Sequence, residues 1–343
     1  MSNTTPTKNE WKQLYSEAEH LFALAPWEDL EEDDIFGVQN PETGQRGFVS
    51  IMGSLGEHLA IAVYLGEEAL YDFWLVHEQQ VPPEQILEVP QLQASFEDRK
   101  ELTAQDRSLI KSLGLKYRGR QAWPMFRSYR PGFLPWYLTG DEVRYLTHVL
   151  AQTRSVVQRL HKTPDLLDPP DDITYLVRVP DTGTDGTVIW NDKMMQIPPP
   201  KVPGREFAVN RDLLDDVRKF KSSRMTFEVD FFFTPMQIQE EKDDRPYFDY
   251  MLLVVEQNSG MIMGVETMGV TTTFTEMLAQ LPQAFLGILA NHKMRPRQIQ
   301  VQSERTYTYL KPICDPLQIK ISLKSYLPFL EEAKSEMLGF LGR

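Results

Sequence analysis

Two neighbouring stretches decide the fold class of the second half of the chain: RMTFEVDFFFTP at Arg224–Pro235 and RPYFDYMLLVVEQNSGMIMG at Arg245–Gly264. Apolar side chains alternate through the first stretch, which is typical of a strand with one buried face. That face carries Met225, Phe227, Val229, Phe231 and Phe233. In the second stretch, a largely apolar run at 251–257 meets an Asn-Ser-Gly turn sequence at 258–260. These features predict three strands, the last two of which form a hairpin.

Helices and strands alternate after this hairpin. Apolar residues recur at helical spacing between Thr273 and Leu289, and Pro282 is expected to kink that helix. The further patterns predict a strand at 298–302, a helix at 305–317, a strand at 318–323 and a helix at 325–340. The second half is therefore predicted to be an α/β domain.

The first half has the pattern of an α+β domain. Predicted helices cover residues 11–22, 69–76, 104–113 and 142–161. Predicted strands cover residues 35–38, 48–52, 59–65 and 123–138. Because Asn40-Pro41-Glu42-Thr43-Gly44 has a turn composition, the first two strands are expected to form a hairpin.

Proline and aspartate mark the expected domain boundary. The stretch Lys162–Asp172, KTPDLLDPPDD, cannot easily continue a helix or a central strand. We therefore expect domains at 1–165 and 166–343, with the core of the second at 225–343. A second proline-rich stretch, IPPPKVPG at Ile197–Gly204, lies inside the second domain on this division.

Composition excludes several classes of protein. The 343 residues carry a formal net charge of −13, which argues against a generally basic nucleic-acid binder. A lone cysteine, Cys314, excludes a disulfide scaffold and a zinc finger, and it is expected to be a small buried residue. No apolar run is long enough to span a membrane. The expected location is the cytoplasm, with no membrane partner.

Two blocks carry a resemblance to a known family. The block DIFGVQNPETGQRGFVSIMGSLGEHLAIAVYLGEEAL at Asp34–Leu70 and the two stretches quoted first resemble an uncharacterised bacterial two-domain family. Both domains of that family are described only as being of unknown function, so the resemblance assigns no role to any residue. The order of elements in the second half also resembles the RNase H-like fold of integrase and transposase cores.

The resemblance to integrase cores implies a carboxylate site. Such cores hold two divalent ions between Asp and Glu side chains, because Mg²⁺ and Mn²⁺ prefer hard oxygen ligands. The candidates in this sequence are Asp230 on the first strand, Glu304 after the fourth strand, and Glu331 on the last helix. The expected aspartate at the end of the fourth strand is absent, because the sequence there is Gln302-Ser303-Glu304. The alternative is that all three are ordinary solvated acids.

A basic segment with interleaved aromatic residues lies at 107–130, and it contains no acid. Its basic residues are Arg107, Lys111, Lys116, Arg118, Arg120, Arg127 and Arg130. Such a segment can bind nucleic acid, because cations contact phosphates and aromatic rings stack on bases. The alternative is that the aromatic rings are buried and the cations pair internally, for example with the acidic run EDLEEDD at Glu28–Asp34.

No complete catalytic motif occurs in the sequence. We therefore predict a non-catalytic binding or interaction protein without a cofactor, whose partner is a protein or a nucleic acid. A nuclease or strand-transfer enzyme that uses Mg²⁺ or Mn²⁺ at Asp230, Glu304 and Glu331 is the alternative. Nucleic-acid binding through 107–130 is a further one.

Overall fold

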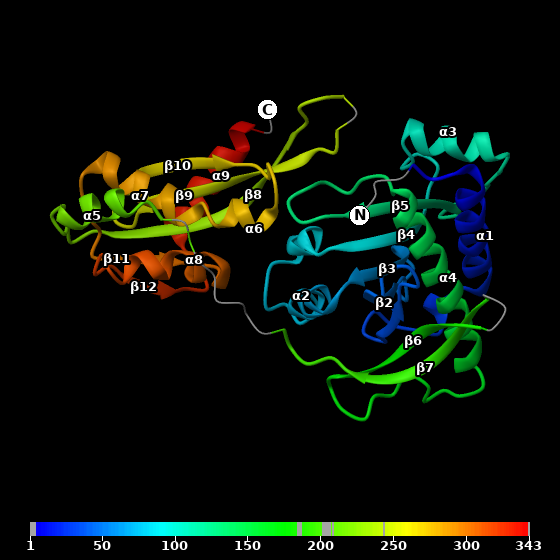
Figure 1. Cartoon of the computed structure of the whole chain (residues 1–343). Helices are drawn as coiled ribbons and strands as arrows, with labels where there is room; N and C mark the ends of the chain where they lie inside the picture. The colour runs from blue at the N-terminus through cyan, green and yellow to red at the C-terminus, as the bar shows by residue number, and fades with distance from the viewer. Residues whose placement is uncertain (1–4, 184–186, 201–206, 208, 243, 342–343) are drawn as a thin grey trace. The chain divides into compact units, whose positions relative to one another are not determined.

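A computed structural model describes residues 5–183, 187–200, 207, 209–242 and 244–341. It divides into two compact units, each with its own sheet (Figure 1). The first unit comprises the described residues up to 200 apart from 132–134, and the second comprises 132–134 and the described residues from 207 onward.

The first unit is built on a seven-stranded sheet with the order β5-β4-β3-β2-β1-β6-β7. Its strands are β1 (Phe36–Gln39), β2 (Arg46–Met52), β3 (Leu59–Leu65), β4 (Gln91–Glu97), β5 (Trp123–Tyr129), β6 (Thr174–Thr182) and β7 (Val188–Gln196). All neighbours are antiparallel except β1 and β6, which are parallel. The predicted strand at 123–138 is shorter than expected, because β5 ends at Tyr129.

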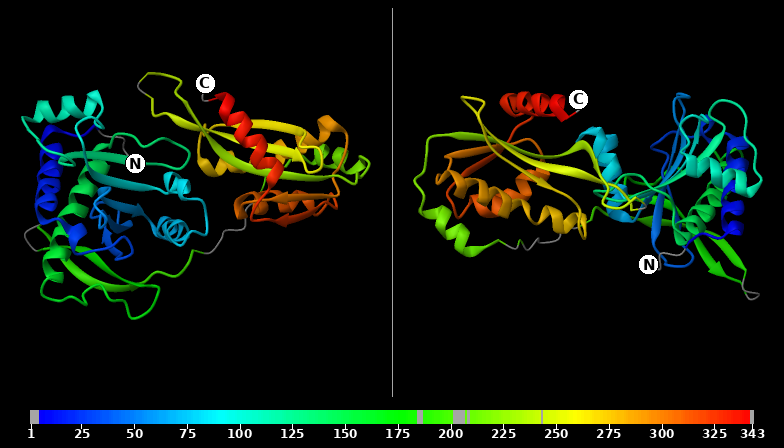
Figure 2. Two further views of the ribbon diagram at one scale, coloured as in Figure 1. Left: turned by 180° about the vertical axis from the view of Figure 1, so that it is seen from behind. Right: turned by 90° about the horizontal axis from the view of Figure 1, so that it is seen from above.

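Four α-helices belong to this unit: α1 (Lys8–Leu24), α2 (Glu67–His77), α3 (Ala104–Leu113) and α4 (Gly140–Leu160). Short 3-10 turns lie at η1 (Pro26–Glu28) and η2 (Pro83–Glu88). Helices α1 and α4 lie side by side on one face of the sheet (Figure 2), and α2 packs on residues of the other face. Capping boxes begin α1, α3 and α4, each formed by a threonine and an acid three residues later.

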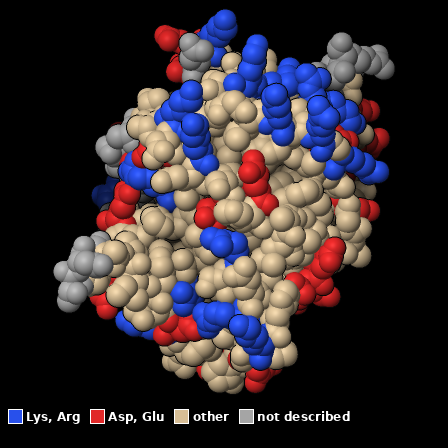
Figure 3. Space-filling model, turned by 90° about the vertical axis from the view of Figure 1, so that its right-hand side faces the viewer, with Lys and Arg blue, Asp and Glu red and all other residues tan. Residues whose placement is uncertain are grey.

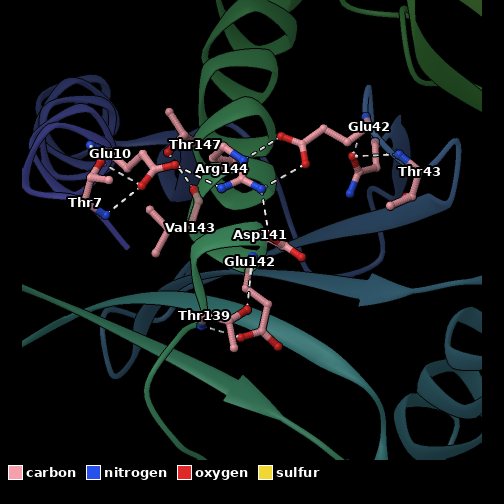
Figure 4. Close-up of polar contacts among 11 residues, drawn as sticks. Thr7, Glu10, Glu42, Thr43, Thr139, Asp141, Glu142, Val143, Arg144 and Thr147 are labelled. Atoms are coloured by element: carbon pink, nitrogen blue, oxygen red, sulfur yellow. Dashed lines mark hydrogen bonds and ion pairs between the residues drawn. The ribbon is translucent and has the colours of Figure 1, made fainter. Parts of the chain in front are cut away.

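One arginine ties three parts of this unit together (Figure 4). Arg144 on α4 contacts Glu10 on α1 at 2.9 Å, Glu42 in the β1–β2 turn at 2.6 Å, and Asp141 on its own helix at 2.7 Å. These carboxylates hydrogen-bond to the guanidinium and raise the pKa of Arg144. The Arg144 guanidinium thereby links α4 to α1 and to the β1–β2 turn.

The boundary expected at 165/166 is wrong, because β6 and β7 complete the first sheet. Residues of β6 pair in parallel with β1, at Gly37↔Val177 and Val38↔Arg178. The first six residues of β6, Thr174 to Val179, are buried in this unit. The units therefore divide after residue 200, at the second proline-rich stretch, of which 201–204 lie outside the described residues.

The second unit is built on a five-stranded sheet with the order β10-β9-β8-β11-β12. Its strands are β8 (Thr226–Ile238), β9 (Tyr247–Glu256), β10 (Ile262–Met268), β11 (Gln298–Val301) and β12 (Lys320–Leu323). The first three are antiparallel neighbours, whereas β8, β11 and β12 are parallel. The second unit is thus a mixed α/β domain, the class that the sequence predicts.

The helices of this unit are α5 (Arg211–Lys219), α6 (Phe274–Leu278), α7 (Leu281–His292), α8 (Glu304–Cys314) and α9 (Pro328–Leu341). Helix α7 packs on the face of the sheet that holds Gly264, and α9 packs on the face that holds Leu253 and Val255. The kink expected at Pro282 is instead a break, because this proline lies in the first turn of the separate helix α7. No helix in the described ranges is long and apolar enough to cross a membrane.

Candidate functional site

Helix α3 and the loops on either side of it carry a group of exposed cations. We call this group the basic surface, and it consists of Arg99, Lys111, Lys116, Arg118 and Arg120. None of these five side chains forms an ion pair with any residue that the structure describes. Figure 3 shows Lys and Arg side chains gathered over the upper part of this side of the molecule, at the height of α3.

Backbone alternation turns these cations outward. Leu115 and Tyr117 pack against the core of the first unit, so Lys116 and Arg118 project to solvent. The Tyr117 ring stacks on Tyr15 with centroids 6.2 Å apart, and its hydroxyl donates to Glu19 at 2.7 Å. Burial and the Glu19 carboxylate raise the pKa of Tyr117. The aromatic side chain therefore fixes the loop that presents the cations.

Three basic residues of the predicted segment have structural roles instead. The Arg127 guanidinium is buried and bonds to Asp106 at 2.6 and 3.0 Å. Arg130 pairs with Glu142 at 3.1 Å, and Arg107 donates to the carbonyl of Leu102. Arg127 and Arg130 are each paired with a carboxylate of their own unit, which is the internal pairing that the alternative interpretation of this segment expects.

The acidic run at Glu28–Asp34 does not neutralise the basic surface. Asp29 lies 2.9 Å from His161, and Asp34 accepts from the backbone N–H of Glu31 at 2.8 Å. Elsewhere in this unit the arginines are paired within the unit. The pairs are Arg46–Glu67, Arg144–Glu10, Arg154–Glu17, Arg159–Asp192 and Arg178–Asp192. Arg99, Arg118 and Arg120 are therefore set apart from the other arginines of the first unit. Among its lysines, Lys8, Lys12, Lys162 and Lys193 are likewise exposed and form no ion pair with a described residue.

Arg99 was missed by the sequence analysis, because it lies before the basic segment. Its guanidinium carbon lies 5.9 Å from the centroid of the Trp123 ring. That ring contacts Tyr117, with centroids 5.8 Å apart. The spacing of aromatic residues in the sequence could not show the contact between Arg99 and Trp123, because Arg99 lies in the β4–α3 loop and Trp123 lies on β5.

In the second unit, β8 and α9 bring two of the three predicted carboxylates together. Asp230 is buried, and the Lys334 ammonium contacts its Oδ2 atom at 2.6 Å and Glu331 Oε1 at 3.3 Å. The ammonium also lies 4.3 Å from the centroid of the Phe232 ring. Burial raises the pKa of Asp230, and the Lys334 ammonium offsets part of the rise.

Glu304 lies in the exposed first turn of α8 and does not join them. In the described part of the chain, no three His, Cys, Asp or Glu side chains are grouped so that they could hold a metal ion. The predicted metal triad does not fit this structure. The physical reasons are that Glu304 lies apart on α8 and that the Lys334 ammonium already contacts the carboxylates of both Asp230 and Glu331.

Sequence reasoning also missed two buried acceptors beside Asp230. Glu228 on β8 is fully buried and accepts the backbone N–H of Leu330 on α9 at 2.8 Å. Burial raises the pKa of Glu228, although this N–H and that of Phe329 lower it. Gln302 follows β11 directly. Its Oε1 atom, like Glu228 Oε1 and Asp230 Oδ1, is buried and has no hydrogen-bond partner in the part of the chain that the structure describes. Only the alternation of β8, which puts Glu228 and Asp230 on one face, could have indicated part of this group.

Comparisons with known proteins agree with the two units. Residues 11–178 match the family model "Domain of unknown function (DUF7309)", and residues 213–338 match "Domain of unknown function (DUF6930)". The chain therefore combines two domains of unknown function, as its resemblance indicated. No curated protein matches the chain.

A solved structure also matches part of the chain. It is the catalytic core domain of BIV integrase, which is 14% identical and aligns over 34% of this chain and 68% of its own with a TM-score of 0.25. This overlap is too small to carry an argument about function.

Proposed function

We propose that this protein acts by binding rather than by catalysis, and that its first unit binds nucleic acid through the basic surface. The observation that carries the proposal is that five exposed cations stay unpaired with described residues, although the chain as a whole is acidic with a net charge of −13. Cations that are unpaired in the free protein can contact phosphates without first breaking an ion pair. Their binding to phosphates is favourable, because it releases the counterions of the nucleic acid.

The loop is suited to hold its cations in a fixed arrangement. Tyr117 is anchored by Tyr15 and Glu19, and the backbone N–H of Gln121 donates to Asp98 at 2.9 Å. Little conformational freedom of the backbone is therefore left to lose on binding. The aromatic rings of the segment face the core, so this surface contacts the phosphate backbone and has no stacking platform of its own.

For the second unit, we propose an RNase H-like fold. The support is the strand order β10-β9-β8-β11-β12, with three antiparallel strands followed by two parallel ones. This strand order is the only support for the nuclease alternative. The support is weak, because one fold can carry many activities. Lys334 argues against a nuclease. We therefore expect the wild type not to cleave oligonucleotides in the presence of Mn²⁺. Cleavage by the wild type that is lost in D230N would support the nuclease alternative.

Fluorescence anisotropy with a labelled oligonucleotide, titrated at several salt concentrations, tests the proposed binding. In R118A/R120A, the loss of two phosphate contacts should weaken binding by about tenfold or more at low salt. The slope of log K against log salt should also become less steep, by about 1.4 to 1.8. Single-stranded and duplex probes distinguish the form of nucleic acid.

A matched control is R211A/R218A, which removes two exposed arginines from α5 of the second unit. This variant changes the net charge equally and should bind as the wild type does. Equal weakening in both variants would point to a general charge effect and contradict the proposal. Absence of wild-type binding at about 50 mM salt would contradict it as well.

A further inference from the structure

Beneath α9, the sheet of the second unit carries a compact set of oxygen acceptors. Glu228 and Asp230 lie two residues apart on β8, so their side chains share the face that α9 covers. Strands β8 and β11 pair in parallel up to Val229↔Val301. Gln302 is the next residue along, so it lies beside Asp230 at the end of this pairing.

Each of these three side chains leaves one buried oxygen without a partner in the described chain. These atoms are Asp230 Oδ1, Glu228 Oε1 and Gln302 Oε1, and none of them has a hydrogen-bond partner among the described residues. Most buried side-chain oxygens in proteins are satisfied, so three unpartnered oxygens on neighbouring strand positions mark a region of negative potential. Such a region attracts a cation, because oxygen ligands of this kind suit Mg²⁺ and Mn²⁺.

The cation that this structure supplies is a side chain. Lys334 extends from α9 with 15% of its side chain exposed, and its ammonium contacts both Asp230 and Glu331. One positive charge thus lies against two carboxylates and over the face of the Phe232 ring, which also favours a cation. The ammonium is a compact point charge on a flexible stem, and these properties let it enter a site of this kind.

We propose that Lys334 takes the place of a divalent cation in the second unit, and that removing its charge opens a site for Mn²⁺ or Mg²⁺ between Asp230, Glu331 and Gln302. In the native chain the ammonium blocks this site by charge and by occupancy. The second unit is therefore a scaffold in which a lysine, supplied by its last described helix, fixes α9 to the sheet. This inference concerns the second unit and does not depend on nucleic-acid binding by the first.

Thermal unfolding with and without millimolar Mn²⁺ tests the proposal on the full chain. The wild type should show no Mn²⁺-dependent shift. K334M keeps an unbranched apolar side chain but loses the charge, so its melting temperature should be lower than that of the wild type without the ion. Mn²⁺ should then raise the melting temperature of K334M by several degrees, and D230N/K334M should lose this response.

A matched control is K311M. Lys311 is an exposed lysine on α8 that pairs with Asp315 at 2.8 Å, so its loss also frees a carboxylate. That carboxylate has no second acid grouped with it for a metal ion in the described residues. K311M should therefore show no response to Mn²⁺.

Two results would overturn the proposal. One is a folded K334M that does not respond to Mn²⁺. The other is a wild-type chain that binds Mn²⁺ and loses that binding in D230N, since lysine and metal would then coexist. If K334M does not fold, refolding of K334M and K334Q with Mn²⁺ decides the question. Recovery of the native circular dichroism spectrum supports the proposal, and failure of both variants to recover contradicts it.

Discussion

Replacing Asp106 by alanine should strongly destabilise the first unit. The carboxylate accepts two hydrogen bonds from Arg127, at 2.6 and 3.0 Å, and both side chains are about nine-tenths buried. It also completes the capping box of α3 by accepting from the backbone N–H of Thr103 at 3.0 Å. In D106A the Arg127 guanidinium would remain buried without its counter-charge.

The expected loss of unfolding free energy in D106A is about 3–5 kcal/mol, the usual cost of leaving one partner of a buried ion pair alone. D106N keeps an oxygen that can cap α3, so it should lose less, about 1–3 kcal/mol. As a control, D315A breaks the exposed pair with Lys311 and should cost no more than about 1 kcal/mol.

Urea unfolding followed by circular dichroism measures these differences, and D106A/R127A completes a double-mutant cycle. A D106A loss below about 1 kcal/mol would refute the argument that the ion pair is buried and essential, because such a loss is typical of exposed pairs. R127A should also bind nucleic acid as well as the wild type per folded molecule, in contrast to R118A/R120A.

The same pair makes stability depend on pH. Burial raises the pKa of Asp106, but the hydrogen bonds and charge of Arg127 and the Thr103 cap outweigh burial, so the net pKa is lowered. A lowered folded-state pKa gives stability that is fully present above the unfolded value of about 3.9 and is lost as pH falls through the folded value. In D106N the unfolding free energy should therefore fall less steeply at acidic pH than in the wild type. An unchanged pH dependence would contradict the role given to Asp106.

Three further outcomes follow from single contacts. Burial raises the pKa of the Cys314 thiol to about 12, so a thiol reagent should modify it only after unfolding, and rapid labelling of the native chain would refute this. A Cβ atom on Gly37 would meet Val177 Cγ2 at 2.8 Å, so G37A should destabilise the first unit by about 1–3 kcal/mol. The loss of unfolding free energy in G37A/V177A should be smaller than the sum of the losses in G37A and V177A. A loss equal to that sum would argue against the contact. E228A should cost about 1–3 kcal/mol because the N–H of Leu330 loses its acceptor, whereas E228Q, which keeps an acceptor, should cost much less in the same urea assay.

Local patterns in the sequence determined many elements of both units, but they did not predict β4, β6, β7 or α5. The alternation of β8, the hairpin of β9 and β10, and the capping threonine of α6 are set within a few residues, so they can be seen without the fold. The same holds for the buried Cys314 and for the position of the basic segment. The placement of β6 was not visible in this way, because its partner β1 lies far away in the sequence.

The tertiary structure alone decided which charges are free. Lys116 and Arg127 belong to one basic segment, yet one is exposed and the other is buried against Asp106, because β5 and α3 meet in the core. Likewise, Asp230 and Lys334 are over a hundred residues apart in the chain, and only the packing of α9 on β8 brings them into contact. Which charges pair over such separations depends on how distant helices and strands pack. The sequence by itself shows the charged residues but not their partners.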